Sequence, residues 1–335
     1  MRPCLHCWDI GIPFVDLFAR WDSAYYANIA LAGYPHQITA RWAFFPGYPI
    51  VIGSFGRLLA MTAQLKLVSA IYLMGFLVSN AAFFGAVYYV TMLSRLILGN
   101  SRSAFTSAAL LAFYPAGVFL SAVYSDSLFL LLTSASLFYL LKGEFGRTTA
   151  LGFLASLTRP VGIVLLVPVV YKLLREPSWR KAAPIVGILL AFLSFVIYGQ
   201  LVAGTPFAST LAEHTYWPFT LNPHDRFIAD LRAILSNPIM MLPFLGLGLG
   251  GVVAFVQEVR SDDETMIGLY AVCLLAAYLV SPLESFPRYS ITLLPTYWTL
   301  SRWSAHFAPK VLIWSLFLIL LAVGTGLFAN WYRFY

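Results

Sequence analysis

The sequence is poor in charged residues. Lys, Arg, Asp and Glu make up 10% of its 335 residues, whereas hydrophobic residues make up 60% and the mean hydropathy is +0.79. An average soluble domain carries about 25% charged residues, so this chain cannot cover a water-facing surface. Apolar runs long enough to cross a bilayer, about 20 residues each, recur along it. The alternating strands of a membrane barrel, about ten residues each, do not. The composition therefore predicts an all-α integral membrane protein.

Other features that the sequence lacks exclude further classes. It has three cysteines, Cys4, Cys7 and Cys273, and the stretch CLHC has too few ligands for a zinc site, which takes about four. No P-loop, Rossmann fingerprint or basic run suited to nucleic acid is present. No apolar signal-peptide segment precedes residue 19. We therefore expect no metal, no cofactor and no nucleic-acid partner.

The apolar runs predict a polytopic helical bundle of about 8–10 membrane segments. They lie at about residues 67–93, 104–124, 127–141, 183–203, 239–257, 265–281 and 311–330, with a weaker run at about 289–301 and two ambiguous segments at 45–64 and 149–171. No repeat or linker divides the chain, so we expect a single transmembrane domain over residues 1–335. Residues 1–66 would form an extracytoplasmic loop with interfacial helices, and residues 67–335 the bundle.

Residues 149–171 are predicted to form a short broken hairpin. Basic residues flank both of its ends, and short loops rich in Lys and Arg stay cytoplasmic, so both ends belong on one side. One full crossing already takes about 20 residues, and Pro160 interrupts a helix at the middle of the segment, next to Arg159. The same rule places residues 19–49 and 205–238 outside the membrane.

Polar residues gather on this extracytoplasmic face, and each has a structural alternative. Asp22, in RWDSAYYANIALAGY, could cap the helix that follows it or act as a base. Asp126, in YSDS, could likewise cap a helix or contact substrate. Arg159 lies in apolar surroundings, where a charge is costly and usually has a partner or a function. Arg288 could instead reach lipid headgroups.

Two arginines and two acids on one membrane face suggest chemistry on a lipid phosphate. Arginine binds phosphate oxygens with a fork of parallel donors, and an aspartate at the interface could deprotonate a sugar hydroxyl. An activated sugar donor would then carry its leaving group on a lipid. Two alternatives stay open. A transporter or flippase of a lipid-linked sugar would use the same arginines, although transporters often show internal repeats, and a non-catalytic subunit would need neither acid.

Four ordered motifs carry a resemblance to a known family. RWDSAYYANIALAGY, AFFPGYP, YPAGVFLSAVYSDSLFLLLT and TRPVG occur in that order over about residues 19–165, and RYSITLLPTYW at 288–298 is a weaker echo. Together they resemble the PIG-V family of GPI mannosyltransferases and its bacterial relatives, within the GT-C class of polytopic glycosyltransferases. The chain departs from that pattern at Tyr25, where eukaryotic members have His, and at TRPVG. The family also implies a first membrane span before the loop, which the residues before 19 do not provide.

The resemblance implies a polyprenyl- or dolichyl-phosphate-mannose donor used on the extracytoplasmic face and transfer of mannose to a hydroxyl with inversion. We further expect the transfer to be metal-independent and the acceptor to be lipid- or glycan-linked, and the shortness of the chain suggests a bacterial plasma membrane. Asp22 matches the catalytic base, and Arg159 matches an arginine that, with Arg288, would bind the donor phosphate. We further expect the loop at residues 205–238, with His214, Tyr216 and Trp217, to receive the acceptor, and Glu213 is a further polar residue of this loop. The expected substrate-binding residues are Trp21, Tyr25, Tyr26, Tyr124, Asp126, Trp217 and Glu284.

Overall fold

The computed structural model describes residues 10–217, 222–236 and 238–332, and every regular element in these ranges is helical. The CLHC stretch lies outside them. The first elements are α1 (Pro13–Asp16), α2 (Ser23–Ala32), η1 (Ala40–Ala43), α3 (Gly47–Ala63), α4 (Leu67–Leu98), α5 (Ser101–Ala112), α6 (Val118–Ser121) and α7 (Asp126–Leu141). Next come α8 (Phe145–Thr158), η2 (Pro160–Leu165), α9 (Leu166–Arg175), α10 (Trp179–Ala203), α11 (Ala208–Tyr216) and α12 (Pro223–Ser236). The chain continues with α13 (Pro238–Leu245), the π-helical turn η3 (Gly246–Gly250), α14 (Gly251–Gln257), α15 (Asp262–Val280), η4 (Leu283–Ser285), α16 (Phe286–Tyr289), η5 (Ser290–Thr292), α17 (Leu294–Trp303) and α18 (Phe307–Ala329).

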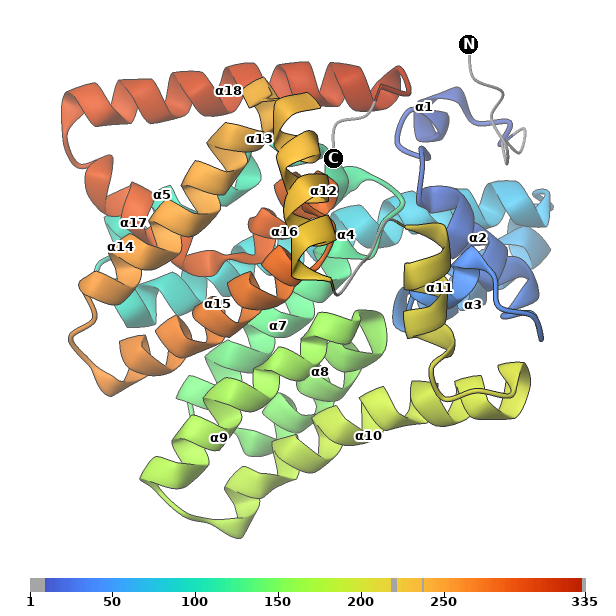
Figure 1. Ribbon diagram of the computed structural model, residues 1–335, viewed down its shortest axis with the longest axis horizontal. Helices are drawn as coiled ribbons and strands as arrows, with labels where there is room; N and C mark the ends of the chain where they lie inside the picture. Colours follow the sequence, from blue (N-terminus) through green and yellow to red (C-terminus); the bar gives the residue numbers. More distant parts are fainter. Residues whose placement is uncertain (1–9, 218–221, 237, 333–335) are drawn as a thin grey trace.

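Four helices in the described ranges are long and apolar enough to cross a membrane. They are α4, residues Lys181–Ala203 of α10, α15 and α18, and two shorter apolar stretches, Asp126–Leu141 and Met241–Gln257, accompany them. The α18 helix lies along one edge of the molecule with much of its apolar surface uncovered (Figure 1). Such surface is stable in lipid and not in water. The predicted all-α, polytopic membrane fold is confirmed.

One predicted membrane segment, 104–124, is wrong as a continuous helix. The α5 helix ends at Ala112, and the short helix α6 begins at Val118 after a turn. Pro115 lies in this turn. Proline lacks an N–H donor and disfavours helical geometry in the residue before it, so the helix cannot continue through FYPAG. The sequence predicts residues 104–124 as one segment because their composition is apolar on both sides of this break.

The broken hairpin at 149–171 is confirmed. The α8 helix ends at Thr158, Arg159 is extended, η2 packs on α8, and α9 leads back against α10 and α15 (Figure 1). The Lys172 ammonium, near the end of α9, donates to the carbonyl of Leu140 at 2.9 Å, just before α8 begins. The chain therefore leaves the hairpin close to where it entered. Arg159 lies at the tip, about 20 Å from the base, since α8 rises about 1.5 Å per residue.

One continuous core joins the N-terminal region to the bundle. Buried hydrophobic residues of this cluster extend from Ile10 to Phe328, and its largest fully buried side chains are aromatic, among them Trp42, Tyr48 and Trp298. The α2 and α3 helices pack on each other and on α4. The proposed division at residue 66 into a loop region and a bundle stays a prediction.

Candidate active site

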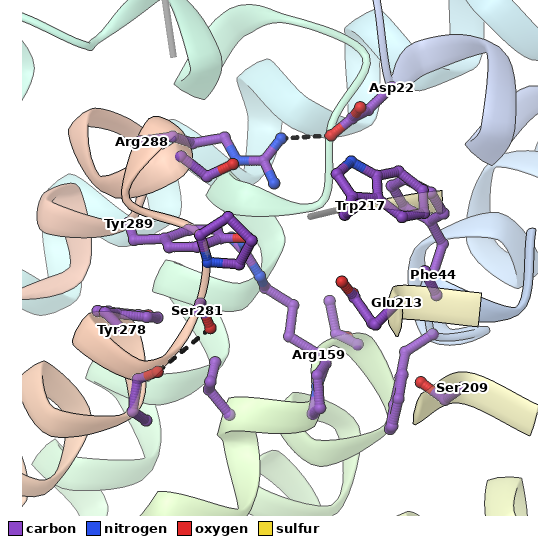
Figure 2. A pocket seen from close by; sticks show the side chains of 18 of the residues that line it. Asp22, Phe44, Arg159, Ser209, Glu213, Trp217, Tyr278, Ser281, Arg288 and Tyr289 are labelled. Carbon is purple, nitrogen blue, oxygen red and sulfur yellow. Dashed lines mark hydrogen bonds and ion pairs between the residues drawn. The ribbon is translucent and has the colours of Figure 1, made fainter. Parts of the chain in front are cut away.

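A cavity of about 460 Å³, a size typical of small-molecule sites, lies where six parts of the chain meet. Its walls come from the start of α2, the end of η1 with the residues after it, the hairpin tip, α10, the α11 segment and the stretch from the end of α15 to α16 (Figure 2). The polar and aromatic lining side chains include Asp22, Tyr26, Phe44, Arg159, Ser209, Thr210, Glu213, Trp217, Tyr278, Glu284, Arg288 and Tyr289.

Four charged side chains form an alternating network along one wall. The Arg288 Nη1 donates to Asp22 Oδ2 at 2.5 Å, and Arg288 Nε lies 3.8 Å from Asp126 Oδ1. The Arg159 Nη1 donates to the same Asp126 oxygen. Asp126 is 1% exposed and both arginine side chains are below 10%, whereas Asp22 is 20% exposed. The buried carboxylate of Asp126 therefore fixes both guanidinium groups, and Asp22 stays open to the cavity.

The ring of Tyr289 lies close to both guanidinium groups. Its centroid lies 5.1 Å from the Arg159 Cζ and 5.2 Å from the Arg288 Cζ, and the Tyr124 ring lies 5.3 Å from the Arg288 Cζ. A cation within about 6 Å of an aromatic face is attracted to the ring. The rings thus hold the two positive groups side by side, although these repel each other.

The conformation of Asp22 argues against a capping role. Asp22 is the residue before α2, but its side chain makes no capping hydrogen bond within the described residues and pairs with Arg288 instead. Trp21, directly before it, has φ of +51°, a left-handed conformation that is unfavourable for a bulky residue. Such strain is typical of functional sites. The Trp21 indole packs edge-on against Trp331, with ring centroids 5.6 Å apart.

Hydrogen bonds dock the first sequence motif on the third. The backbone N–H of Asp22 donates to the Tyr124 Oη at 3.1 Å. The hydroxyls of Tyr26 and Ser125 are hydrogen-bonded to each other at 2.7 Å in a buried position. The stretch RWDSAYY is therefore held against YSDS, so that Asp22 and Asp126 lie on either side of Arg288.

The motif AFFPGYP supports the hairpin tip. A Cβ on Gly47 would lie 2.7 Å from the Thr158 Oγ1 and 2.9 Å from the Thr158 Cα, so only glycine allows this approach. Tyr48, the next residue, donates to the carbonyl of Gly75 at 2.9 Å. The start of α3 is thus fixed between α4 and the residue preceding Arg159, which positions Arg159 in the cavity.

An aromatic wall faces the charged network. The Tyr25 and Phe44 rings are stacked, with centroids 4.9 Å apart, and Trp217 lies edge-on to both at 5.9 and 5.8 Å. Phe44 and Trp217 line the cavity, and Tyr25 packs behind them. Aromatic faces of this kind suit the apolar side of a sugar ring.

The predicted site residues divide into two groups. The cavity is lined by Asp22, Tyr26, Arg159, Trp217, Glu284 and Arg288, and not by Trp21, Tyr25, Tyr124 and Asp126. Asp126 and Tyr124 lie behind the wall, where they hold the arginines, so we now interpret them as positioning residues. His214 and Tyr216 also lie outside the cavity lining. Sequence reasoning assigned no role of its own to Tyr289, Phe44 or Glu213, although each lies in or beside a segment that it had named.

Glu213 is a third carboxyl group in the cavity. Burial raises its pKa to about 7, with a further contribution from the negative charge of Asp22, while Arg288 and Arg159 oppose the shift. Its carboxyl group points from α11 into the cavity, between Trp217 and Arg159 (Figure 2). A carboxyl that titrates near neutrality is typical of functional sites. Within the described ranges no three His, Cys, Asp or Glu side chains are placed to share a metal ion, and metal independence stays a prediction.

Comparison with known proteins tests the predicted resemblance. Residues 13–177 match the family model described as Mannosyltransferase (PIG-V). The resemblance to the PIG-V mannosyltransferase family is confirmed. The match includes all four of the ordered motifs and therefore Asp22, Asp126 and Arg159, but not α11 or Arg288. The match covers about half of the chain, and this half supplies Asp22, Phe44 and the hairpin tip with Arg159 to the cavity lining.

Individual relatives agree with this match. The chain is 35% identical over 153 residues to GPI alpha-1,6-mannosyltransferase 2 of Cricetulus griseus, which covers 44% of this chain and 29% of that protein. It thus spans less than a third of that relative. It is 22% identical over 333 residues to GPI mannosyltransferase 2 of Yarrowia lipolytica, covering 92% of this chain and 86% of that protein.

Solved structures support the fold. The apo structure of ArnT from Cupriavidus metallidurans is similar with a TM-score of 0.55 at 16% identity, covering 94% of this chain and 62% of ArnT. A second structure of the same protein, bound to undecaprenyl phosphate, gives a TM-score of 0.53 at 17% identity. At this identity the similarity concerns the fold alone, which is the predicted GT-C-like helical fold.

Proposed function

We propose that this chain is an inverting mannosyltransferase that uses polyprenyl-phosphate-mannose as donor and a hydroxyl of a lipid- or glycan-linked acceptor. One observation carries the proposal: Asp22, Arg288, Asp126 and Arg159 form a fixed network on one wall of a cavity whose opposite wall is aromatic. The arginines would bind the phosphate, the aromatic wall would pack on the sugar, and Asp22 would act as the base. The PIG-V family match and the names of the relatives support mannose as the sugar.

Asp22 takes the role of general base. The acceptor hydroxyl oxygen attacks C1 of the mannose as its proton passes to the Asp22 carboxylate, and the bond between C1 and the phosphate oxygen breaks. The leaving group is the polyprenyl phosphate, and attack from the opposite side inverts the configuration at C1. A positioned base of this kind contributes about 10²–10⁴-fold to the rate.

Arg159 and Arg288 take the role of phosphate ligands. Each commits one Nη1 to a carboxylate, and a guanidinium has five N–H donors, so both retain donors for phosphate oxygens. They stabilise the charge that develops on the leaving phosphate, and fixed donors of this kind need little reorganisation during the reaction. Arg288 also links base and leaving group, because it contacts Asp22 directly. The undecaprenyl phosphate bound by ArnT, a protein of similar fold, agrees with a lipid phosphate as ligand.

We place the site on the extracytoplasmic face of a bacterial plasma membrane. The basic residues Lys142, Arg147, Lys172 and Arg175 gather at the base of the hairpin, and the cavity lies at its tip. Clusters of Lys and Arg in short loops mark the cytoplasmic side. The donor would therefore be consumed outside, where its headgroup reaches the cavity.

The test is donor cleavage by the protein reconstituted in liposomes. With donor labelled in the mannose, the proposed enzyme transfers the label to acceptor and leaves unlabelled polyprenyl phosphate. A transporter or flippase would move the donor across the bilayer while the label stays on the lipid. Label that crosses the membrane still attached to polyprenol would overturn the proposed function.

A further inference from the structure

The α11 segment presents a single polar and aromatic face to the cavity. Ser209, Thr210, Glu213 and Trp217 line the cavity, whereas Ala208 and Ala212 are buried on another side of the same helix. Ser209 and Thr210 precede Glu213 by four and three residues on one face of α11, and Trp217 follows directly after the helix, so these four side chains form one row along the cavity.

The position of this row is fixed by contacts outside the cavity. α11 packs on η1, and the Tyr216 hydroxyl donates to the carbonyl of Ile38 at 3.3 Å. Trp217, directly after α11, packs against Phe44 and Tyr25. The row therefore faces the charged network across the cavity, as the view of Glu213 and Trp217 shows (Figure 2).

The chemistry of the row differs from that of the opposite wall. The opposite wall holds two cations, which suit a phosphate. The row contains two hydroxyls, one carboxyl and one indole, and it contains no cation. Hydroxyl and carboxyl groups hydrogen-bond to sugar hydroxyls, and an indole face packs on the apolar face of a pyranose. The row thus suits a saccharide that carries no phosphate at this position.

We propose that the cavity face of α11 is the acceptor subsite, that the acceptor group bound there is an uncharged saccharide, and that neutral Glu213 donates a hydrogen bond to one of its hydroxyls. This inference rests on the proposed function. It assigns Glu213 a role in acceptor selection and leaves the base role with Asp22.

The surroundings of Glu213 favour its neutral form when donor is bound. Burial and Asp22 raise its pKa to about 7, against the opposing effect of Arg288 and Arg159. The phosphate of a bound sugar donor would offset the positive charges of these two arginines. The other charged residue in the lining, Glu284, is an acid and does not favour the ionised form of Glu213. The carboxyl would therefore keep its proton around neutral pH and act as a donor.

The experiment compares two reactions of the purified protein with polyprenyl-phosphate-mannose. One uses octyl α-mannoside as acceptor, and the other uses water and releases free mannose. Glu213→Gln keeps a neutral hydrogen-bond donor at this position, and Glu213→Ala removes it. His214→Ala is the matched control, because His214 is exposed on the same helix and does not line the cavity.

We expect Glu213→Ala to raise the KM for the octyl mannoside about tenfold, the effect of one lost hydrogen bond, and to lower mannose release by water by a clearly smaller factor. Glu213→Gln should keep the wild-type KM at pH 6. In the wild type this KM should stay constant up to about pH 7 and rise at higher pH, because the carboxyl then loses its proton, and in Glu213→Gln it should stay constant throughout. His214→Ala should behave as wild type.

Two results would overturn the inference while leaving the proposed function intact. One is an unchanged acceptor KM in Glu213→Ala. The other is an equal loss of water-dependent mannose release in both Glu213 variants, which would make Glu213 part of the chemical step. A wild-type protein that consumes no donor would instead refute the proposed function itself.

Discussion

At the scale of single residues, Asp22 and Asp126 have different tasks although both pair with arginine. Asp126 is 1% exposed and forms ion pairs with both Arg159 and Arg288. Asp22 is 20% exposed and forms an ion pair with Arg288. Removing one partner of a buried ion pair leaves an uncompensated buried charge. We therefore expect substitution of Asp126 to affect mainly stability, and we propose that substitution of Asp22 affects mainly the reaction.

Asp126→Asn should therefore destabilise the protein by about 3–5 kcal/mol, the usual cost of breaking a buried pair from one side. Asp22→Asn should cost about 1 kcal/mol or less, because a partly solvated pair contributes little. The thermal unfolding midpoint in detergent measures both. Equal shifts for the two variants would contradict the division of roles.

At the scale of structural elements, the hairpin depends on its glycine. A Cβ on Gly162 would lie 2.6 Å from both the Cα and the N of Ser156, so η2 could not close against α8. Since Ser156 and Gly162 lie on either side of Arg159, any separation there moves the arginine away from the cavity.

Gly162→Ala should accordingly raise the KM for polyprenyl-phosphate-mannose by about tenfold or more, because the N–H groups of a displaced Arg159 no longer match the phosphate oxygens. Gly146→Ala, at the other end of α8, is the control, since nothing lies within 4 Å of its added methyl group. Donor KM values for the two variants check this. The interpretation fails if both variants bind donor as the wild type does.

The elements show what could and could not be predicted from the sequence. The hairpin was predictable because Pro160 breaks a helix and flanking charges fix both ends on one side. The break at Pro115 was missed because its apolar neighbours suggested a single span. Glu213 could not be assigned, because its role depends on how α11 packs on η1 in three dimensions. Local patterns predict helices and their breaks, but not which distant helix completes a cavity.

At the scale of the whole molecule, the account requires the cavity and the basic hairpin base to face opposite sides of the membrane. The hairpin base carries Lys142 and Arg147, and α11 lies beside the cavity at the other end. Their sidedness can be tested with single cysteines, once the three native cysteines are replaced by serine.

Thr215→Cys, exposed on α11, should react with a membrane-impermeant maleimide in intact cells. Glu144→Cys, exposed at the hairpin base, should react only after the cells are permeabilised. Labelling is read by the mass shift of the purified protein. The reverse pattern would show that the site faces the cytoplasm and would exclude an extracytoplasmic donor.

The role of Asp22 as the base is tested by the rate at which Asp22→Asn releases polyprenyl phosphate from saturating polyprenyl-phosphate-mannose in the presence of acceptor. We expect a rate about 10²–10⁴-fold below wild type, with donor affinity within a few fold, because both arginines remain held by Asp126. A wild-type rate in Asp22→Asn would contradict the assignment of Asp22 as the base.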